Sequence, residues 1–196
     1  MRKVSMLILI VFALCSTANA QYSSKKRTGF KVGLNYSALR IKGVTSSSYS
    51  NFKIGAVVGL FREIPLSERV VFQPELYYSR LGGKSNDITT NLSYFSIPAL
   101  FKFHGKKLGF YVGPQASLLL SAKQIDAADT KSDIKSTLKS VDLSGITGFD
   151  YSFGKEGAYV VGLRYQYALN NIVKNPNPAG TGLLNYSVQA SFGFRF

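Results

Sequence analysis

The sequence has little of the chemistry on which metal proteins and disulfide-rich proteins depend. Its 196 residues include no tryptophan, one cysteine, Cys15, and one histidine, His104. Zinc-type sites need several cysteine or histidine ligands, and a disulfide framework needs cysteines in pairs. The sequence therefore predicts no metal, no cofactor and no disulfide, so the fold must be stabilised by other means.

Long hydrophobic runs are also missing. No stretch approaches the roughly 18 consecutive apolar residues of a transmembrane helix. The first twenty residues have a basic start at Arg2 and Lys3, a short apolar run and a small-residue end at Ala20. This pattern is typical of a secretory signal peptide. We therefore expect 1–20 to be a cleaved signal peptide, 21–27 a short basic lead-in and 28–196 one folded domain.

Acidic residues are few, at 10 against 24 basic residues. Removing Arg2 and Lys3 with the signal peptide leaves 22 basic residues and a net charge of +12. Basic proteins bind polyanions, and for an exported chain these are lipid phosphates or other anionic surfaces rather than nucleic acid.

The feature that the sequence does have is a regular alternation of apolar and polar residues. In the last segment, the apolar positions from Leu184 to Phe196 are all even and the polar positions are odd. A period of two indicates a strand with one apolar and one polar face. Seven earlier segments show the same pattern, and the sixth is the least regular. The eight predicted strands are 30–37, 52–61, 72–79, 94–103, 108–118, 141–151, 159–169 and 184–196.

The connections between these segments alternate in length. Short connections are expected at 62–69, 104–107 and 154–157, and longer polar ones at 41–51, 81–91, 121–140 and 170–181. Outer-membrane barrels have short periplasmic turns and longer extracellular loops. The sequence therefore predicts an all-β fold, an eight-stranded antiparallel up-and-down transmembrane β-barrel with this arrangement. Pro74, Pro98 and Pro114 are expected at bulges or strand ends, because proline cannot complete a strand ladder.

A soluble ligand-binding barrel shows the same period with its faces exchanged, so that its apolar face is inside. Two features favour the membrane alternative. The apolar faces carry no charge, and aromatic residues gather towards the strand ends, as they do at membrane interfaces. The membrane barrel is the preferred interpretation, and the soluble barrel is the alternative.

The polar faces predict the contents of the barrel. Eight strands enclose just enough room for side chains and no open channel. Buried charges must be paired, so we expect Glu75, Asp142 and Asp150 to form salt bridges with basic residues in a polar plug. The predicted interior network consists of Lys31, Lys53, Glu75, Lys102, Asp142, Asp150, Arg164 and Arg195, with Gln73, Gln115, Gln166 and Gln189.

The sequence does not show a catalytic pair. His104 lies in a predicted turn, and Ser96 precedes it by eight residues on the same predicted strand. At about 3.4 Å per residue the two are about 27 Å apart, which is beyond hydrogen-bond reach. We therefore expect no catalytic residues, and a lipid-modifying barrel enzyme is disfavoured.

Several segments resemble strands of the PorT-like outer-membrane β-barrel family of Bacteroidetes-type Gram-negative bacteria, and together they cover most of the expected domain. The resemblance implies an outer-membrane location. Because the namesake of the family is associated with secretion, it also implies an accessory role in protein export as an alternative function. The segments are Tyr94-Phe-Ser-Ile-Pro-Ala-Leu-Phe-Lys102, Leu108-Gly-Phe-Tyr-Val-Gly-Pro-Gln-Ala-Ser117, Asp142-Leu-Ser-Gly-Ile-Thr-Gly-Phe-Asp150 and Gly162-Leu-Arg-Tyr-Gln-Tyr-Ala-Leu-Asn-Asn-Ile172.

The expected function is that of a small integral outer-membrane protein with a structural or loop-mediated role. Phe194 and Phe196 fit an insertion signal for the barrel-assembly machinery. Expected partners are outer-membrane lipid and lipopolysaccharide, and an unknown protein at the extracellular loops; nucleic acid is not expected. The residues placed to meet lipopolysaccharide phosphates are Arg40, Lys42, Arg80 and Lys84.

Overall fold

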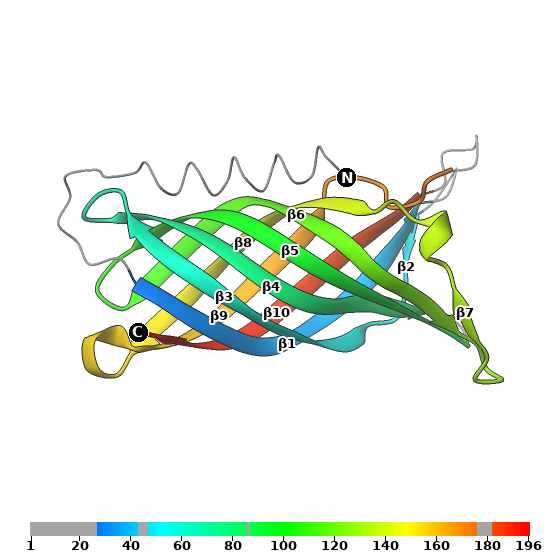
Figure 1. Ribbon diagram of the computed structural model, residues 1–196, viewed down its shortest axis with the longest axis horizontal. Coiled ribbons are helices and arrows are strands. Elements are labelled where there is room, and N and C mark those ends of the chain that lie inside the picture. The colour runs from blue at the N-terminus through cyan, green and yellow to red at the C-terminus, as the bar shows by residue number, and fades with distance from the viewer. Residues whose placement is uncertain (1–26, 43–46, 86, 176–181) are drawn as a thin grey trace.

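The computed structural model describes residues 27–42, 47–85, 87–175 and 182–196. Eight long antiparallel strands follow one another around a closed barrel, and the last pairs with the first (Figure 1). The predicted eight-stranded antiparallel barrel is therefore confirmed. The long strands are β1 (Arg27–Lys42), β3 (Lys53–Pro65), β4 (Val70–Ser85), β5 (Ile88–His104), β6 (Leu108–Ile125), β8 (Val141–Phe153), β9 (Tyr159–Ala168) and β10 (Gly182–Arg195).

Four short elements accompany the barrel: β2 (Ser47–Tyr49), which pairs with β1, β7 (Lys131–Asp133), which pairs with β6, and the 3-10 turns η1 (Lys135–Thr137) and η2 (Lys155–Gly157). Residues 1–26, with the predicted signal peptide and most of the lead-in, lie outside the described residues. Arg27, which the sequence placed in the lead-in, already belongs to β1 and is paired with Glu63.

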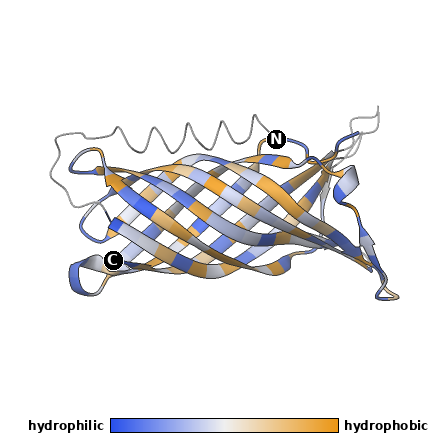
Figure 2. Cartoon of the chain, viewed as in Figure 1, coloured by the Kyte–Doolittle hydropathy of each residue, from blue (hydrophilic) through white to orange (hydrophobic). Residues whose placement is uncertain are grey.

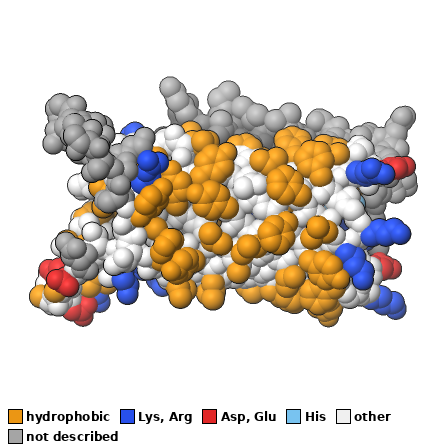
Figure 3. Space-filling view, turned by 180° about the vertical axis from the view of Figure 1, so that it is seen from behind, with side chains coloured by type: hydrophobic (Ala, Val, Ile, Leu, Met, Phe, Trp, Pro, Cys, Tyr) orange, Lys and Arg blue, Asp and Glu red, His pale blue; other side chains and the backbone are white. Residues whose placement is uncertain are grey.

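The strand faces are arranged as in a membrane barrel, with the apolar side chains outside. On β1, Phe30, Val32 and Leu34 are between 42% and 58% exposed, whereas Lys31 and Asn35 are buried. Hydrophobic and hydrophilic residues alternate along the strands (Figure 2), and the charged side chains visible on the outer surface gather at the two ends (Figure 3). A soluble barrel would bury its apolar face, so this arrangement decides against the soluble alternative.

Aromatic side chains form contacts near both ends of this outer wall. At one end, Tyr159 packs against Phe192 and Phe194, with ring centroids 6.0 and 5.6 Å apart. At the other end, Tyr36 stacks on Phe52 at 4.3 Å. Aromatic girdles of this kind flank the apolar band of outer-membrane barrels. No helix in the described residues is long and apolar enough to cross a membrane.

The expectation of bulges or strand ends at the prolines is wrong. Pro74, Pro98 and Pro114 lie inside β4, β5 and β6. Next to each proline, two consecutive residue pairs are missing from the ladder with one neighbouring strand. Beyond this gap the two strands pair again in the same register. Proline lacks the N–H that would complete the ladder, so it interrupts the hydrogen bonds without shifting the strands. The register shift within the β5–β6 pair lies elsewhere, between Ser93 and Tyr94.

Several predicted connections are strand instead. The predicted loop 81–91 is largely taken up by β4 and β5, which leave only 86–87 between them, and the predicted turn 62–69 shrinks to 66–69. Within 121–140, β6 continues to Ile125 before β7 and η1. The barrel end with the connections 66–69, 105–107 and 154–158 is called the short-turn end, and the opposite end the long-loop end. In the extension of β4 and β5, glycine and polar residues such as Gly82, Gly83, Lys84 and Ser85 follow one another, so the alternation that reveals a strand in the sequence is lost there.

Candidate functional site

The interior of the barrel holds eight buried charged residues among those that the structure describes. Four are basic and four are acidic, so the interior charges sum to zero. This balance lets a narrow polar lumen exist without a large uncompensated charge. The residues are Lys31, Lys102, Arg164, Arg195, Glu63, Glu75, Asp142 and Asp150.

Glu75 of β4 is the centre of the first ion cluster. Its carboxylate lies 2.6 Å from Lys31 Nζ of β1 and 2.8 Å from Arg164 Nη2 of β9. Gln73 Nε2 donates a further hydrogen bond of 2.6 Å to the same carboxylate. The Arg164 guanidinium also lies over the Tyr111 ring, 5.3 Å from its centroid. This cluster joins β1, β4 and β9 across the lumen.

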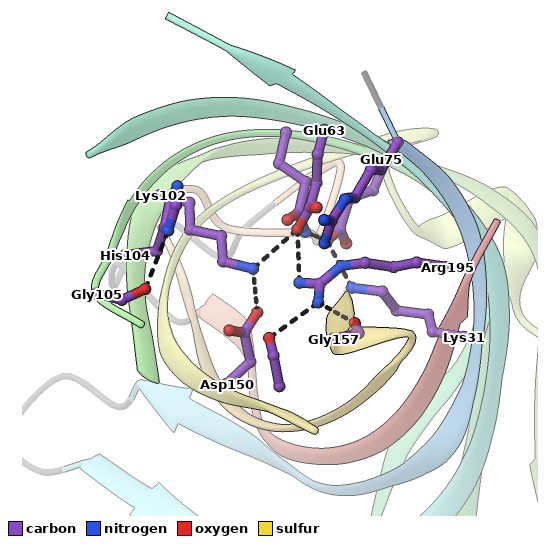
Figure 4. A network of polar contacts seen from close by, with 12 residues as sticks. Lys31, Glu63, Glu75, Lys102, His104, Gly105, Asp150, Gly157 and Arg195 are labelled. Atoms are coloured by element: carbon purple, nitrogen blue, oxygen red, sulfur yellow. Dashed lines mark hydrogen bonds and ion pairs between the residues drawn. The ribbon is translucent and has the colours of Figure 1, made fainter. Parts of the chain in front are cut away.

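Glu63 of β3 is the centre of the second ion cluster, at the short-turn end (Figure 4). Its carboxylate lies 2.9 Å from Lys102 Nζ of β5 and 2.8 Å from Arg195 Nη2 of β10. Lys102 also contacts Asp150 of β8 at 2.7 Å. Arg195 Nη1 donates hydrogen bonds to Ser152 Oγ and to the carbonyl oxygen of Gly157. Four strands (β3, β5, β8 and β10) and the η2 turn are thereby joined across the barrel mouth.

Asp142 does not form the expected salt bridge. Its side chain is buried, but its partner is Asn185, whose Nδ2 donates a hydrogen bond of 2.6 Å to Asp142 Oδ2. Asn185 Nδ2 also donates to the Tyr94 hydroxyl across the barrel. No ion pair to Asp142 is found among the described residues. The four buried basic residues pair instead with Glu63, Glu75 and Asp150.

Lys53 is also outside the interior clusters. It begins β3 at the long-loop end and is only partly buried. Its electrostatic neighbours are the like charges of Arg80 and Lys84. The structure therefore brings together six of the eight predicted residues in two clusters, and leaves Asp142 and Lys53 apart from them.

An apolar cluster closes the lumen at the long-loop end. Leu138, beside η1, and Ile172, after β9, fold onto inward-facing residues of four strands. Lys139 N donates to the Ile172 carbonyl oxygen at 2.7 Å, which holds the two loops together. We call this cluster the apolar cap. Its members are Leu39, Leu81, Leu92, Tyr94, Leu119, Ala122, Leu138 and Ile172.

The short-turn end is open and forms a vestibule of about 610 Å³ whose inner wall includes Glu63, Lys102, Asp150 and Arg195. Deeper in the lumen, a cavity of about 20 Å³ lies between the two ion clusters. A space of that size holds a single water molecule. The lumen is thus open at the short-turn end, crossed by charge pairs in its middle and closed by the apolar cap at the long-loop end.

The described residues show no arrangement for catalysis or metal binding. Ser96 and His104 lie on the same strand, and the Ser96 hydroxyl donates to Ser117 Oγ instead. His104 Nδ1 contacts the neighbouring Gly105 carbonyl oxygen. Within the described ranges, no three His, Cys, Asp or Glu side chains gather as metal ligands would.

Two parts of the site were missed by sequence reasoning. Glu63 was assigned to a turn, although the alternation of β3 continues through Phe61 and Glu63 as inward positions. Extending the predicted strand beyond Phe61 would have placed Glu63 in the interior. Tyr77, Tyr94 and Tyr111 were not among the predicted interior residues. They are buried, and the Tyr77 hydroxyl donates to Gln115 Oε1.

The two residues of the predicted insertion signal lie at the end of β10. The Phe194 ring contacts Phe30 on β1 with centroids 6.0 Å apart. Phe196 is 72% exposed, and its backbone N–H donates to the Thr28 carbonyl oxygen at 2.8 Å. The backbone of the final strand is therefore hydrogen-bonded to β1 as far as Phe196.

Solved structures with this architecture include small outer-membrane barrels. Neisserial surface protein A (NspA) is 16% identical over 85% of this chain and 97% of its own, with a TM-score of 0.58. Ail, the attachment invasion locus protein of Yersinia pestis, is 13% identical over 88% of this chain and all of its own, with a TM-score of 0.50. Its complex with the heparin analogue sucrose octasulfate is 15% identical over the same shares, with a TM-score of 0.53.

At these identities the similarity shows a shared fold. No curated protein sequence matches the chain. The model of the outer membrane protein beta-barrel domain family matches residues 19–174, which is most of the sequence. With its outward apolar wall, closed eight-stranded sheet and polar interior, the chain belongs to the outer membrane protein beta-barrel domain family and is a small outer-membrane barrel.

Proposed function

We propose that this protein is a closed, non-catalytic outer-membrane barrel that acts structurally or through the surface of its long-loop end. One observation carries the proposal. The lumen is crossed by charged side chains that balance one another, four basic and four acidic, and it is capped by apolar residues. Such an interior offers neither a continuous water path nor a net charge to select ions.

The first experiment measures conductance. Purified full-length protein is inserted into planar lipid bilayers, and single-channel currents are recorded. We expect a quiet baseline, because the Glu75 cluster and the apolar cap both obstruct the lumen. Stable, large openings of the wild-type protein would overturn the proposal.

We further propose that the short turns face the periplasm and the long-loop end faces the cell exterior, as in other outer-membrane barrels. Cys15, in the predicted signal peptide, is the only cysteine of the sequence. Single substitutions Lys106→Cys and Asp129→Cys, at exposed positions on opposite ends, therefore give clean labelling sites. In intact cells a membrane-impermeant maleimide should label the residue-129 variant and spare the residue-106 variant, and both should react after lysis. The reverse pattern would invert the orientation.

Binding partners follow from this orientation. Outer-membrane lipid and lipopolysaccharide would surround the wall, a protein partner would meet the long loops, and the barrel-assembly machinery would engage β10 during insertion. Cell fractionation provides the basic check, since the protein should be found with the outer membrane and should migrate differently on gels before and after heating.

An accessory role in protein export is the second candidate, and it rests on the family resemblance alone. The closed lumen makes the barrel unsuited to conduct a polypeptide, so such a role would depend on contacts at the barrel ends. A deletion strain with an unchanged set of secreted proteins would remove this candidate.

A further inference from the structure

A basic cavity of about 340 Å³ lies at the long-loop end, and we call it the outer-wall groove. Four cationic side chains line it: Lys53, Arg80, Lys123 and Lys131. The lining also contains the hydroxyl groups of Ser93 and Ser121, and no acidic residue. The groove therefore concentrates positive charge together with hydrogen-bond donors.

The groove is part of the outward face of the barrel. Arg80 follows Leu76 and Tyr78 at alternate positions of β4, which face outward, and it is exposed. Ser93 is paired with Arg80 and with Ser121, so these three residues lie on the same face of neighbouring strands. The groove thus continues the lipid-facing wall just beyond Tyr78, whose hydroxyl donates to Ser93 Oγ at 3.1 Å.

The four cations of the groove take part in no ion pair among the described residues. The nearest acid in the strand pairing is Asp133, opposite Lys123, but it does not line the cavity and its Oδ1 accepts a hydrogen bond from Lys135 N. Arg80 and Lys84 act on Lys53 as like charges. Repulsion of this kind is relieved when an anion binds.

We propose that the outer-wall groove binds a phosphate group of an outer-leaflet glycolipid. The inference deepens the proposed function, since it requires an outer-membrane barrel with its long loops outside. The position of the groove favours a lipid over a soluble anion. The groove adjoins the apolar wall next to Tyr78, and tyrosines in such positions lie at the level of lipid headgroups.

The residue types suit this ligand. The Arg80 guanidinium presents paired N–H donors that match two phosphate oxygens, and lysines at positions 53, 123 and 131 contribute compact charges. The two serine hydroxyls supply neutral donors to remaining oxygens. The acyl chains of the same lipid would lie along the exposed Leu76 and its apolar neighbours.

The test measures lipid retention by native mass spectrometry on the refolded full-length protein, with bisphosphorylated lipid A as the probe. The groove variant carries Arg80→Gln, Lys123→Gln and Lys131→Gln. The matched control carries Lys106→Gln, Lys107→Gln and Lys155→Gln, which removes the same charge from exposed positions at the short-turn end. We expect about tenfold or greater loss of lipid A affinity for the groove variant and little change for the control.

Two further probes identify the source of the anion. Dephosphorylated lipid A should bind the wild-type protein and the groove variant equally. Sucrose octasulfate tests a soluble polyanion, and binding of that compound at the groove without retention of lipid A would overturn the lipid assignment.

Equal losses of lipid A affinity in the groove variant and the control variant, or no loss in either, would overturn the site. The conductance and labelling results do not depend on these three side chains, so failure of this inference leaves the proposed function intact.

Discussion

Arg164 and Glu75 face each other across the full width of the barrel, with Arg164 Nη2 2.8 Å from Glu75 Oε2. Their strands, β9 and β4, are four positions apart in either direction around the eight-stranded ring. All five ion pairs found among the described residues join strands that are not neighbours. The ion pairs therefore connect strands that the sheet does not hold together. Their removal should lower the stability of the barrel and open its lumen.

Glu75→Gln should be strongly destabilising, because it leaves Lys31 and Arg164 buried without a negative partner. Removing one side of a buried pair costs about 3–5 kcal/mol. Urea unfolding of the refolded protein in detergent micelles would measure the loss, and planar-bilayer recording should show brief openings that the wild-type protein lacks. An unfolding free energy within about 1 kcal/mol of wild type would contradict the assigned central role.

Asp142→Asn should behave differently, although Asp142 is just as deeply buried. Its carboxylate has an amide partner and no ion pair within the described part of the chain. Replacing it with a neutral side chain of the same shape therefore removes a costly buried charge. We expect a change of less than about 1 kcal/mol or a gain in stability. A loss as large as that of Glu75→Gln in the same urea experiment would show that Asp142 has a charged partner after all.

Glu63→Gln tests the cluster at the vestibule. The substitution separates Lys102 and Arg195 from their shared carboxylate, although Lys102 keeps Asp150 and Arg195 keeps its bonds to Ser152 and Gly157. The expected cost is therefore smaller than for Glu75, about 1–3 kcal/mol. Glu68→Gln, in the exposed 66–69 turn, is the matched control and should be neutral; equal effects would mean that only net charge matters.

Leu138→Ser together with Ile172→Ser should open the apolar cap. Each change removes a buried apolar side chain, at a cost of about 2–4 kcal/mol, and the loops should then be cut faster by protease added to intact cells. Leu169→Ser is the control, because Leu169 is 61% exposed in the same connection. Protease sensitivity that rises equally in the control would exclude a specific role for the cap.

Deletion of Phe196 should reduce insertion into the outer membrane more than it lowers the melting temperature of refolded protein. The side chain is largely exposed, so little packing is lost, whereas under the proposed function the assembly machinery engages this strand during insertion. Heat-modifiable gel mobility of membrane fractions measures insertion, and calorimetry of refolded protein measures stability. Parallel losses in both would assign Phe196 a structural role instead.

Much of the interior could be predicted from the sequence. Within a strand the face of each residue follows from its parity, so Lys31, Glu75, Lys102 and Arg164 could be placed inside. The strand ends were harder to place. Glu63 was assigned to a turn because the predicted strand was ended at Phe61, although the alternation continues to Glu63. The segment beyond Leu81 was expected to be a loop because glycine and polar residues replace the apolar-polar alternation there, and a local pattern is the only strand signal in a sequence.

The sequence by itself determined the closed eight-stranded barrel and its apolar outer face, because strand periodicity is a local property. The pairing of charges was decided only by the tertiary structure. Strand tilt and register decide which side chains meet in the lumen, so Glu75 meets Arg164 from the opposite wall while Asp142, also inward, meets the amide of Asn185. The apolar cap depends likewise on Leu138 and Ile172, two loop residues that meet only when the barrel has closed.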